Sequence, residues 1–176
     1  MFSRRVEHFI ESVIRDMTRL ALRHEAINLA QGFPDFPAPE ELKRAAASAI
    51  MEDYNQYSIT WGAKDLRDEI ARKAKVYNHI EADPESEVTV TCGSTEAMMA
   101  SMLALINEGD EVVIFEPFYE NYGPDAAVSG AIPCFVPLNE DNSIDEDALA
   151  SAFNKKTRAL ILNSPNNPCG KVFTKA

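Results

Sequence analysis

From residue 87 onward, short segments rich in β-branched residues alternate with segments whose composition favours helices. The predicted strands cover residues 87–92, 111–115, 132–136 and 158–162. The predicted helices between them cover residues 95–107, 120–129 and 145–153. Strands that alternate with helices form sheets that are largely parallel and covered on both faces. The sequence therefore predicts a three-layer α/β/α fold with a mostly parallel sheet.

The residues before this alternation predict helices joined by loops. Apolar side chains recur at i, i+3, i+4 and i+7 over residues 5–23, which indicates an amphipathic helix. A second helix is predicted from Pro39 to about Glu52, and a third over residues 64–78. The helix over 5–23 can pack on its own domain or form an arm that packs on a partner subunit. The pattern does not decide between these two roles.

Charge and cysteine content exclude several classes of function. The chain has 17 Lys and Arg against 28 Asp and Glu, a formal net charge of −11, and we expect neither nucleic acid nor an anionic membrane as a partner. Cys92, Cys134 and Cys169 lie far apart without a CxxC pair, so no metal site is predicted and a reducing cytoplasm fits best. The longest apolar stretch, 97–106, is too short to span a bilayer.

Three loops follow predicted strands, and ligands of such sheets bind beyond the strands' carboxyl ends. The first contains Gly93, Ser94 and Thr95, whose backbone N–H groups at a helix start suit a bound anion. The same residues also suit an ordinary helix cap. Neither GxxxxGK[ST] nor GxGxxG occurs, so the loop matches no nucleotide-binding fingerprint.

The other two loops carry aromatic and amide side chains. Tyr119 lies in an aromatic run over 116–122 that suits stacking on a flat ring, although aromatic residues more often pack in a core. Asn167 lies between prolines in the run 163–171, which fixes its backbone and lets its carboxamide donate to a phenolic oxygen. A surface turn is the simpler explanation of a run rich in Asn, Pro and Gly.

Five segments together resemble the class I and II aminotransferases, pyridoxal-phosphate (PLP) enzymes of fold type I. The segments are INLAQGFPDFPAP, NQYSITWG, VTVTCGSTEAM, EGDEVVIFEPFYENY and LNSPNNPCGKVF. Their order and intervals are also similar to the family's, over nearly the whole chain. The motifs QGFPDF and SPNNPxGK are most similar to those of aminotransferases for kynurenine, glutamine, methionine and other aromatic or sulfur-containing amino acids.

The resemblance implies PLP as the cofactor and gives roles to the loop residues. The turn of Gly93, Ser94 and Thr95 cradles the phosphate. Tyr119 stacks on the pyridine ring. Asn167 binds the ring's phenolic oxygen and helps to hold the substrate carboxylate.

Two further residues gain roles from the resemblance. Gly32 lines the carboxylate site through its backbone, and Tyr57 reaches the phosphate of the other subunit in a homodimer. The implied domains are 1–45, an N-terminal helical arm with part of a small domain, and 46–176, the N-terminal half of the PLP-binding large domain. The implied reaction moves an amino group between an amino acid and a 2-oxo acid.

The family's ring-nitrogen acid, its paired tyrosine, its Schiff-base lysine and its carboxylate-binding arginine match positions beyond Ala176. We therefore expect the chain to be an N-terminal portion that has no catalytic residue of its own and is inactive alone. A PLP-dependent carbon–sulfur lyase, a non-catalytic PLP-fold binding domain and an unrelated nucleotide-binding domain remain alternatives. The sequence does not fix the amino donor or the oxo acid.

Overall fold

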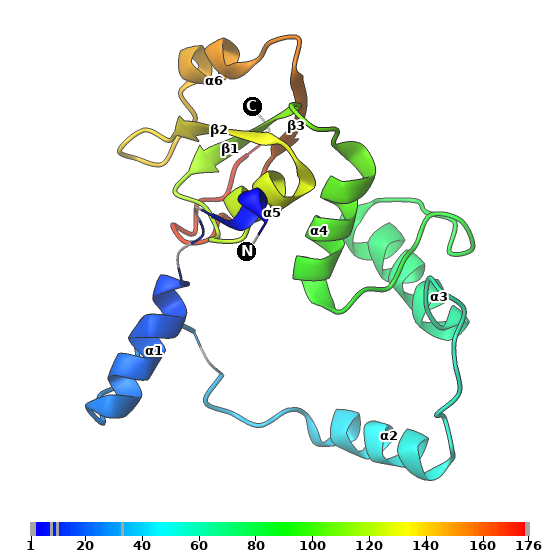
Figure 1. The fold of residues 1–176 in the computed structure, drawn as a ribbon. Coiled ribbons are helices and arrows are strands. Elements are labelled where there is room, and N and C mark those ends of the chain that lie inside the picture. The colour runs from blue at the N-terminus through cyan, green and yellow to red at the C-terminus, as the bar shows by residue number, and fades with distance from the viewer. Residues whose placement is uncertain (1–2, 8, 10, 33, 175–176) are drawn as a thin grey trace. The chain divides into compact units, whose positions relative to one another are not determined.

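The computed structural model describes residues 3–7, 9, 11–32 and 34–174 of the chain. The chain forms two compact units (Figure 1). The sheet unit comprises residues 1–10 and 92–176, and the helical unit comprises residues 11–91. The domain boundary predicted between residues 45 and 46 remains a prediction.

The sheet unit is built on three parallel strands in the order β2-β1-β3. They are β1 (Glu111–Glu116), β2 (Ile132–Pro137) and β3 (Thr157–Ile161). The central strand β1 is buried from Val112 to Phe115, as expected for a strand with neighbours on both edges and helices on both faces. The predicted parallel sheet is confirmed, and these strands agree with the predicted ranges to within one residue.

Helices cover both faces of this sheet. Helices α4 (Gly93–Leu105) and α5 (Tyr122–Ser129) pack on the face that carries Val112 and Ile114. Helix α6 (Glu146–Ala152) packs on the face that carries Val113 and Phe115. Alternation of side chains along one strand thus supplies two cores, and the predicted three-layer arrangement is confirmed (Figure 1).

Local signals set the ends of these helices. Asp145 accepts a hydrogen bond from the Ala148 N–H at 2.9 Å and begins α6. Gly130 ends α5 at φ +95°, where a Cβ would come within 3.3 Å of the Glu108 backbone. Glycine is therefore favoured there on two counts, by its left-handed conformation and by the close approach.

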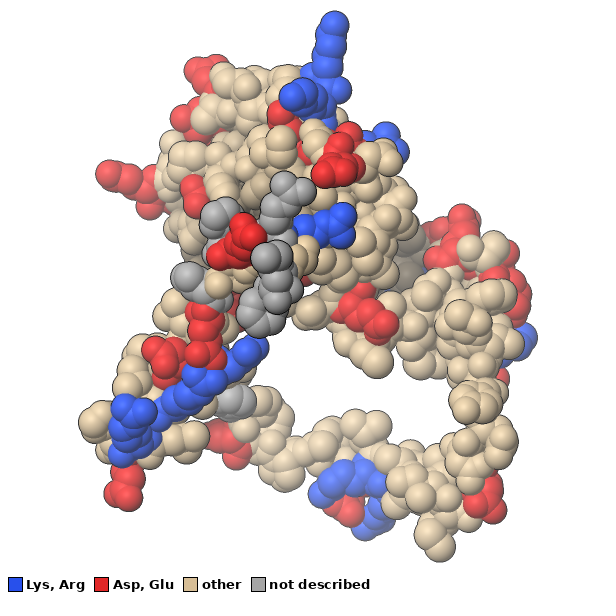
Figure 2. Space-filling view, viewed as in Figure 1, with Lys and Arg blue, Asp and Glu red and all other residues tan. Residues whose placement is uncertain are grey.

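The helical unit contains α1 (Val13–Arg23), α2 (Glu40–Met51), α3 (Lys64–Lys73) and a π-helical turn, η2 (Ala74–Asn78). Its surface mixes both signs of charge: Figure 2 shows basic and acidic side chains side by side along α1 and α2, where Arg19 pairs with Glu11 and Lys43 pairs with Glu40. None of the helices in the described ranges has the length and hydrophobicity needed to cross a membrane.

The single helix predicted over residues 5–23 is wrong. The structure has a short 3₁₀ turn, η1 (Arg4–Val6), and then α1, which begins after Ser12. The Ser12 hydroxyl accepts from the Arg15 N–H at 3.3 Å, so a capping signal inside the apolar pattern restarts the helix. Predicted helix residues 8 and 10 lie outside the described residues. In the sheet unit, η1 packs against α5.

The strand predicted over residues 87–92 is also wrong. The segment is irregular, and the Val90 N–H donates to the Trp61 carbonyl at 2.9 Å instead of joining a ladder. β-branched residues favour an extended backbone, but a strand also requires a neighbouring strand to pair with. The segment that Val90 bonds to, around Trp61, is a loop and not a strand.

One buried arginine holds this part of the helical unit together. Arg67 of α3 is 1% exposed, and its guanidinium donates to the carbonyls of Gly62 and Pro84 and to the Glu85 carboxylate. The planar guanidinium has enough donors to bind several acceptors at once. Arg67 thus joins the loop before α3 to the segment after η2.

Candidate functional site

The carboxyl ends of β1 and β3 lie at one edge of the sheet because the two strands are parallel neighbours. The loop after β1 and the loop after β3 therefore start close together. A side-chain bond confirms this: the Asn166 Nδ2 donates to the Pro117 carbonyl at 3.4 Å. The structure thus brings the loop of Tyr119 and the loop of Asn167 together.

The start of α4 is tied to the same edge. The Asn121 Nδ2 donates to the Thr95 Oγ1 at 3.3 Å, which joins the loop after β1 to the first turn of α4. Because the amide occupies a lone pair of that oxygen, the Thr95 hydroxyl proton remains available to another acceptor. All three predicted loops are therefore linked through two asparagine carboxamides.

The first turn of α4 has the properties of an anion site. Gly93 has φ +81°, and a Cβ there would meet no heavy atom within 4 Å. Ser94 and Thr95 are exposed, and backbone N–H groups in the first turn of a helix have no acceptor within that helix. The Cys92 N–H donates to the Glu96 carboxylate, so a negative group already lies at this helix start.

The aromatic residues after β1 divide between two environments. Phe118 packs against the core and stacks on Phe135 with ring centroids 5.1 Å apart. Tyr119 is half-buried and meets Tyr122 edge-on at 5.8 Å. Burial, and to a smaller extent Tyr119, raises the pKa of Tyr122 above its ordinary value. Phe118 is thus explained by core packing, whereas the ring of Tyr119 stays partly exposed.

The loop after β3 closes on itself around Asn166. The Asn166 N–H donates to the Lys171 carbonyl, and its carbonyl accepts from the Gly170 N–H, both at 2.8 Å. The Asn167 N–H donates to the Asn163 Oδ1 at 2.7 Å. Among the described residues, the exposed Asn167 carboxamide has no hydrogen-bond partner, which leaves it available to a ligand.

The remaining predicted site residues lie in the helical unit. Gly32 is exposed, and Tyr57 is fully exposed. Their roles toward a substrate and a second subunit remain predictions. Asn121 and Asn166 are not among the site residues predicted from the sequence. Their only signal there is that each lies in a run with predicted function, 116–122 for Asn121 and 163–171 for Asn166.

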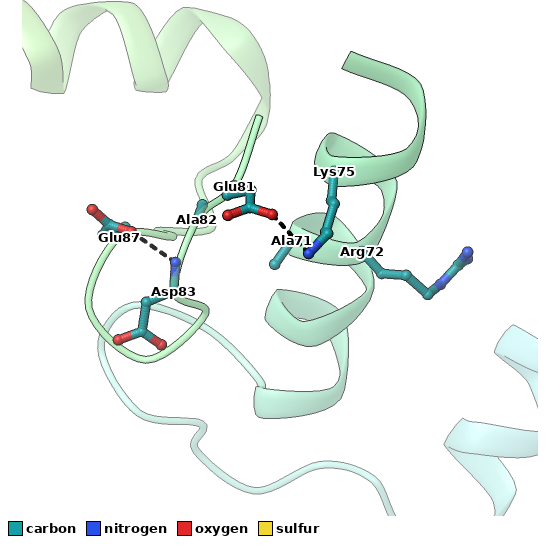
Figure 3. A pocket seen from close by; sticks show the side chains of 7 residues that line it. All are labelled: Ala71, Arg72, Lys75, Glu81, Ala82, Asp83 and Glu87. Atoms are coloured by element: carbon teal, nitrogen blue, oxygen red, sulfur yellow. Dashed lines mark hydrogen bonds and ion pairs between the residues drawn. The ribbon is translucent and has the colours of Figure 1, made fainter. Parts of the chain in front are cut away.

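A surface hollow of about 430 Å³ lies in the helical unit (Figure 3) and contains none of the predicted site residues. Lys75 and Glu81 form an ion pair across it at 2.8 Å, and Glu87 accepts from the Asp83 N–H at 2.7 Å. The pairing with Lys75 lowers the pKa of the Glu81 carboxyl. These charges satisfy one another, as on an ordinary solvated surface. Across the described ranges, no group of three or more His, Cys, Asp or Glu could hold a metal ion.

Comparisons with known proteins identify the family of the chain. A family model described as "Aminotransferase class I and II" matches residues 24–176. The "Probable N-succinyldiaminopimelate aminotransferase DapC" of Mycobacterium tuberculosis is 43% identical over 97% of this chain and 44% of its own length. The methionine aminotransferase of Escherichia coli is 39% identical over 94% of this chain and 43% of its own length.

The solved structure of N-succinyldiaminopimelate aminotransferase from M. tuberculosis superposes with a TM-score of 0.93 at 42% identity, covering 99% of this chain and 46% of that one. The chain thus spans less than half the length of these relatives. The chain belongs to the class I and II aminotransferases, a family of PLP-dependent enzymes.

Proposed function

We propose that this chain supplies the phosphate- and ring-binding part of a PLP-dependent aminotransferase site. One observation carries the proposal. Two carboxamides, from Asn121 and Asn166, link the start of α4 and the loops after β1 and β3 at one sheet edge. These loops present anion donors, an aromatic face and an unused carboxamide, which match a phosphate, a pyridine ring and a phenolic oxygen.

The start of α4 would hold the phosphate. The N–H groups of Ser94 and Thr95 and both hydroxyls offer donors, and the positive end of the helix dipole favours a dianion. The absent Cβ at Gly93 leaves room for the anion to approach the backbone. Asn121 leaves the Thr95 hydroxyl proton free to be donated to the phosphate.

The other two loops would hold the ring. Tyr119 presents a half-buried aromatic face. The Asn167 carboxamide can donate to the phenolic oxygen and, together with the Gly32 backbone, contact a substrate carboxylate. When PLP is bound, it supplies the electron sink for proton removal from the amino acid. The residues described here bind and orient the cofactor.

The proposal extends to substrates and partners. The donor is an amino acid, in the aromatic, sulfur-containing or glutamine class, and the acceptor is a 2-oxo acid. The active form is a cytoplasmic homodimer in which Tyr57 binds the cofactor phosphate of the other subunit. The relatives named above are aminotransferases, so they give the carbon–sulfur lyase alternative no support.

A titration of the purified chain tests the binding role. We expect PLP to bind more tightly than pyridoxal, which lacks the phosphate, and ATP not to compete. Replacing both Ser94 and Thr95 by alanine should weaken PLP binding by about a hundredfold or more, because each hydroxyl donates to a charged group, and should leave pyridoxal binding unchanged. The matched control is Ser101→Ala on the same helix, whose hydroxyl bonds the Ala97 carbonyl.

Binding of ATP in preference to PLP would overturn the proposal in favour of a nucleotide-binding domain.

An assay of amino transfer tests the expectation that the chain is inactive alone. Of the eight lysines, Lys171 lies in the loop after β3, but its Nζ donates to the Asp141 carbonyl at 3.3 Å. We expect no amino transfer above that of free PLP, and a clear rate from the chain alone would contradict the expectation that none of these lysines is catalytic.

A further inference from the structure

Asn166 is a buried polar residue in a loop that is otherwise largely exposed. It is 6% exposed, whereas Asn167, the next residue, is exposed. Buried carboxamides are hydrogen-bonded to protein groups or to ordered water, since bulk water does not reach them. The partners of Asn166 therefore show what it holds in place.

The Asn166 side chain bonds in two directions. Its Nδ2 donates to the Pro117 carbonyl at 3.4 Å, in the loop that carries Tyr119. Its Oδ1 accepts from the Cys169 N–H at 3.4 Å and from the Cys169 Sγ at 3.2 Å, within its own loop. With the backbone bonds to Gly170 and Lys171, one residue closes its loop and joins it to the neighbouring one.

We propose that Asn166 is a positioning residue that aims the Asn167 carboxamide at the cofactor's phenolic oxygen. The inference rests on the proposed function. Asn166 does not touch the ring in this scheme, because its polar atoms are used within the protein. It fixes the backbone on one side of Asn167, and Pro168 fixes the other side. The bond to Pro117 sets the position of Asn167 relative to Tyr119.

The test compares PLP with its 3-deoxy analogue, which lacks the phenolic oxygen, by isothermal titration of the purified chain. Wild-type chain should prefer PLP about tenfold, the worth of one well-placed hydrogen bond. Asn167→Ala should abolish this preference. Asn166→Ala should reduce it to about twofold or less, because a misaligned carboxamide loses most of a directional bond.

Asn154→Ala is the matched control. The Asn154 Nδ2 also crosses between elements, donating to the Glu111 carboxylate at 2.6 Å, but at the opposite end of β1. Asn154 is exposed, so its loss should lower the urea midpoint less than the loss of Asn166 does, and it should leave the preference for PLP intact. If the role of Asn166 is merely structural, Asn166→Ala should likewise lower the midpoint and leave the preference intact.

Asn166→Asp separates the two directions of bonding and serves if Asn166→Ala does not fold. Aspartate retains an acceptor for Cys169 but cannot donate to the Pro117 carbonyl, so we expect the preference to be lost here too. An undiminished preference in Asn166→Ala or Asn166→Asp would overturn the proposal. Equal binding of PLP and analogue by wild type would overturn it together with the bond from Asn167 to the phenolic oxygen, but would spare the phosphate-binding part of the proposed function. Failure of wild type to bind PLP at all would overturn both.

Discussion

The sheet unit and the helical unit bury their apolar residues to very different extents. In the sheet unit, β1 alone contributes four buried side chains, and helices cover both of its faces. In the helical unit, α1 and α2 bury no residue and Leu29 is 90% exposed; among the described residues of this unit, the most buried side chain is Arg67. The sheet unit therefore carries its own hydrophobic core, and the helical unit depends more on hydrogen bonds and local helix stability.

Truncation of the central strand should give the largest effect. Ile114 is 1% exposed, so Ile114→Ala removes packing on the α4–α5 face and should cost about 2–5 kcal/mol of unfolding free energy. Leu29→Ala should change it by less than about 0.5 kcal/mol. Urea denaturation followed by far-UV circular dichroism measures both. Equal losses would show that the two units do not differ in this way.

The next effect concerns Arg67. Arg67→Met leaves the carbonyls of Gly62 and Pro84 without their donor and should lower the free energy of local opening by about 2 kcal/mol. Faster amide exchange should appear over residues 61–90, with fluorescence of Trp61 as a second probe. Arg72→Met on the same helix removes only the exposed pair with Glu69 and should have little effect. Faster exchange across the sheet unit would contradict the division into units.

Among its described residues, the sheet unit contains one buried side-chain oxygen without a hydrogen-bond partner. Asp125 is 6% exposed, its Oδ2 has no partner among the described residues, and burial raises the pKa of its carboxyl. The folded state therefore holds this proton more tightly than the unfolded state, so stability falls as the pH rises past the ordinary carboxyl pKa. Asp125→Asn should add about 1 kcal/mol near pH 7 and almost nothing near pH 4.

Urea titrations of both chains at several pH values check this prediction. The decisive quantity is the difference between variant and wild type, which should grow with pH. An advantage that is constant with pH, or that shrinks as the pH rises, would show that the carboxyl is ionised in the folded protein without penalty.

Two helix caps provide the smallest contrast. Asp145→Ala removes the cap of α6, a helix packed on the β1 core, and should cost about 1 kcal/mol of global stability. Ser12→Ala removes the cap of α1, which buries no residue, and should fray α1 without moving the main unfolding transition. Amide exchange in each helix distinguishes the two results.

The accuracy of sequence prediction follows the same division. Strands and helices of the sheet unit were predictable because periodicity, β-branched composition and terminal residues such as Gly130 all indicate the same elements. The segment 87–92 was mispredicted because composition reports an extended backbone and not the presence of a pairing neighbour. The break before α1 was missed because the apolar spacing continues through the cap at Ser12.

The candidate site divides in a similar way. Tyr119 and Asn167 could be placed at one sheet edge because the parallel strands before them end together. Ser94 could not be placed on that ground, because the strand predicted before it is absent and the bond from Asn121 to Thr95 ties the start of α4 to the edge instead. Asn166 could not be singled out, because burial distinguishes it from Asn167 and adjacent identical residues give no such signal in sequence.

Substitutions on the two faces of β1 should differ in whether they affect the binding loops as well as stability. On one face, α4 and α5 adjoin the loops proposed to bind the cofactor; on the other, α6 packs without contributing any proposed site residue. Amino-acid changes under α6 should thus adjust thermal tolerance with less effect on the binding loops, except at Phe115, whose ring lies 6.2 Å from that of Phe173 at the end of the loop after β3. The same freedom does not extend beneath α4 and α5, where each repacking also shifts the binding loops.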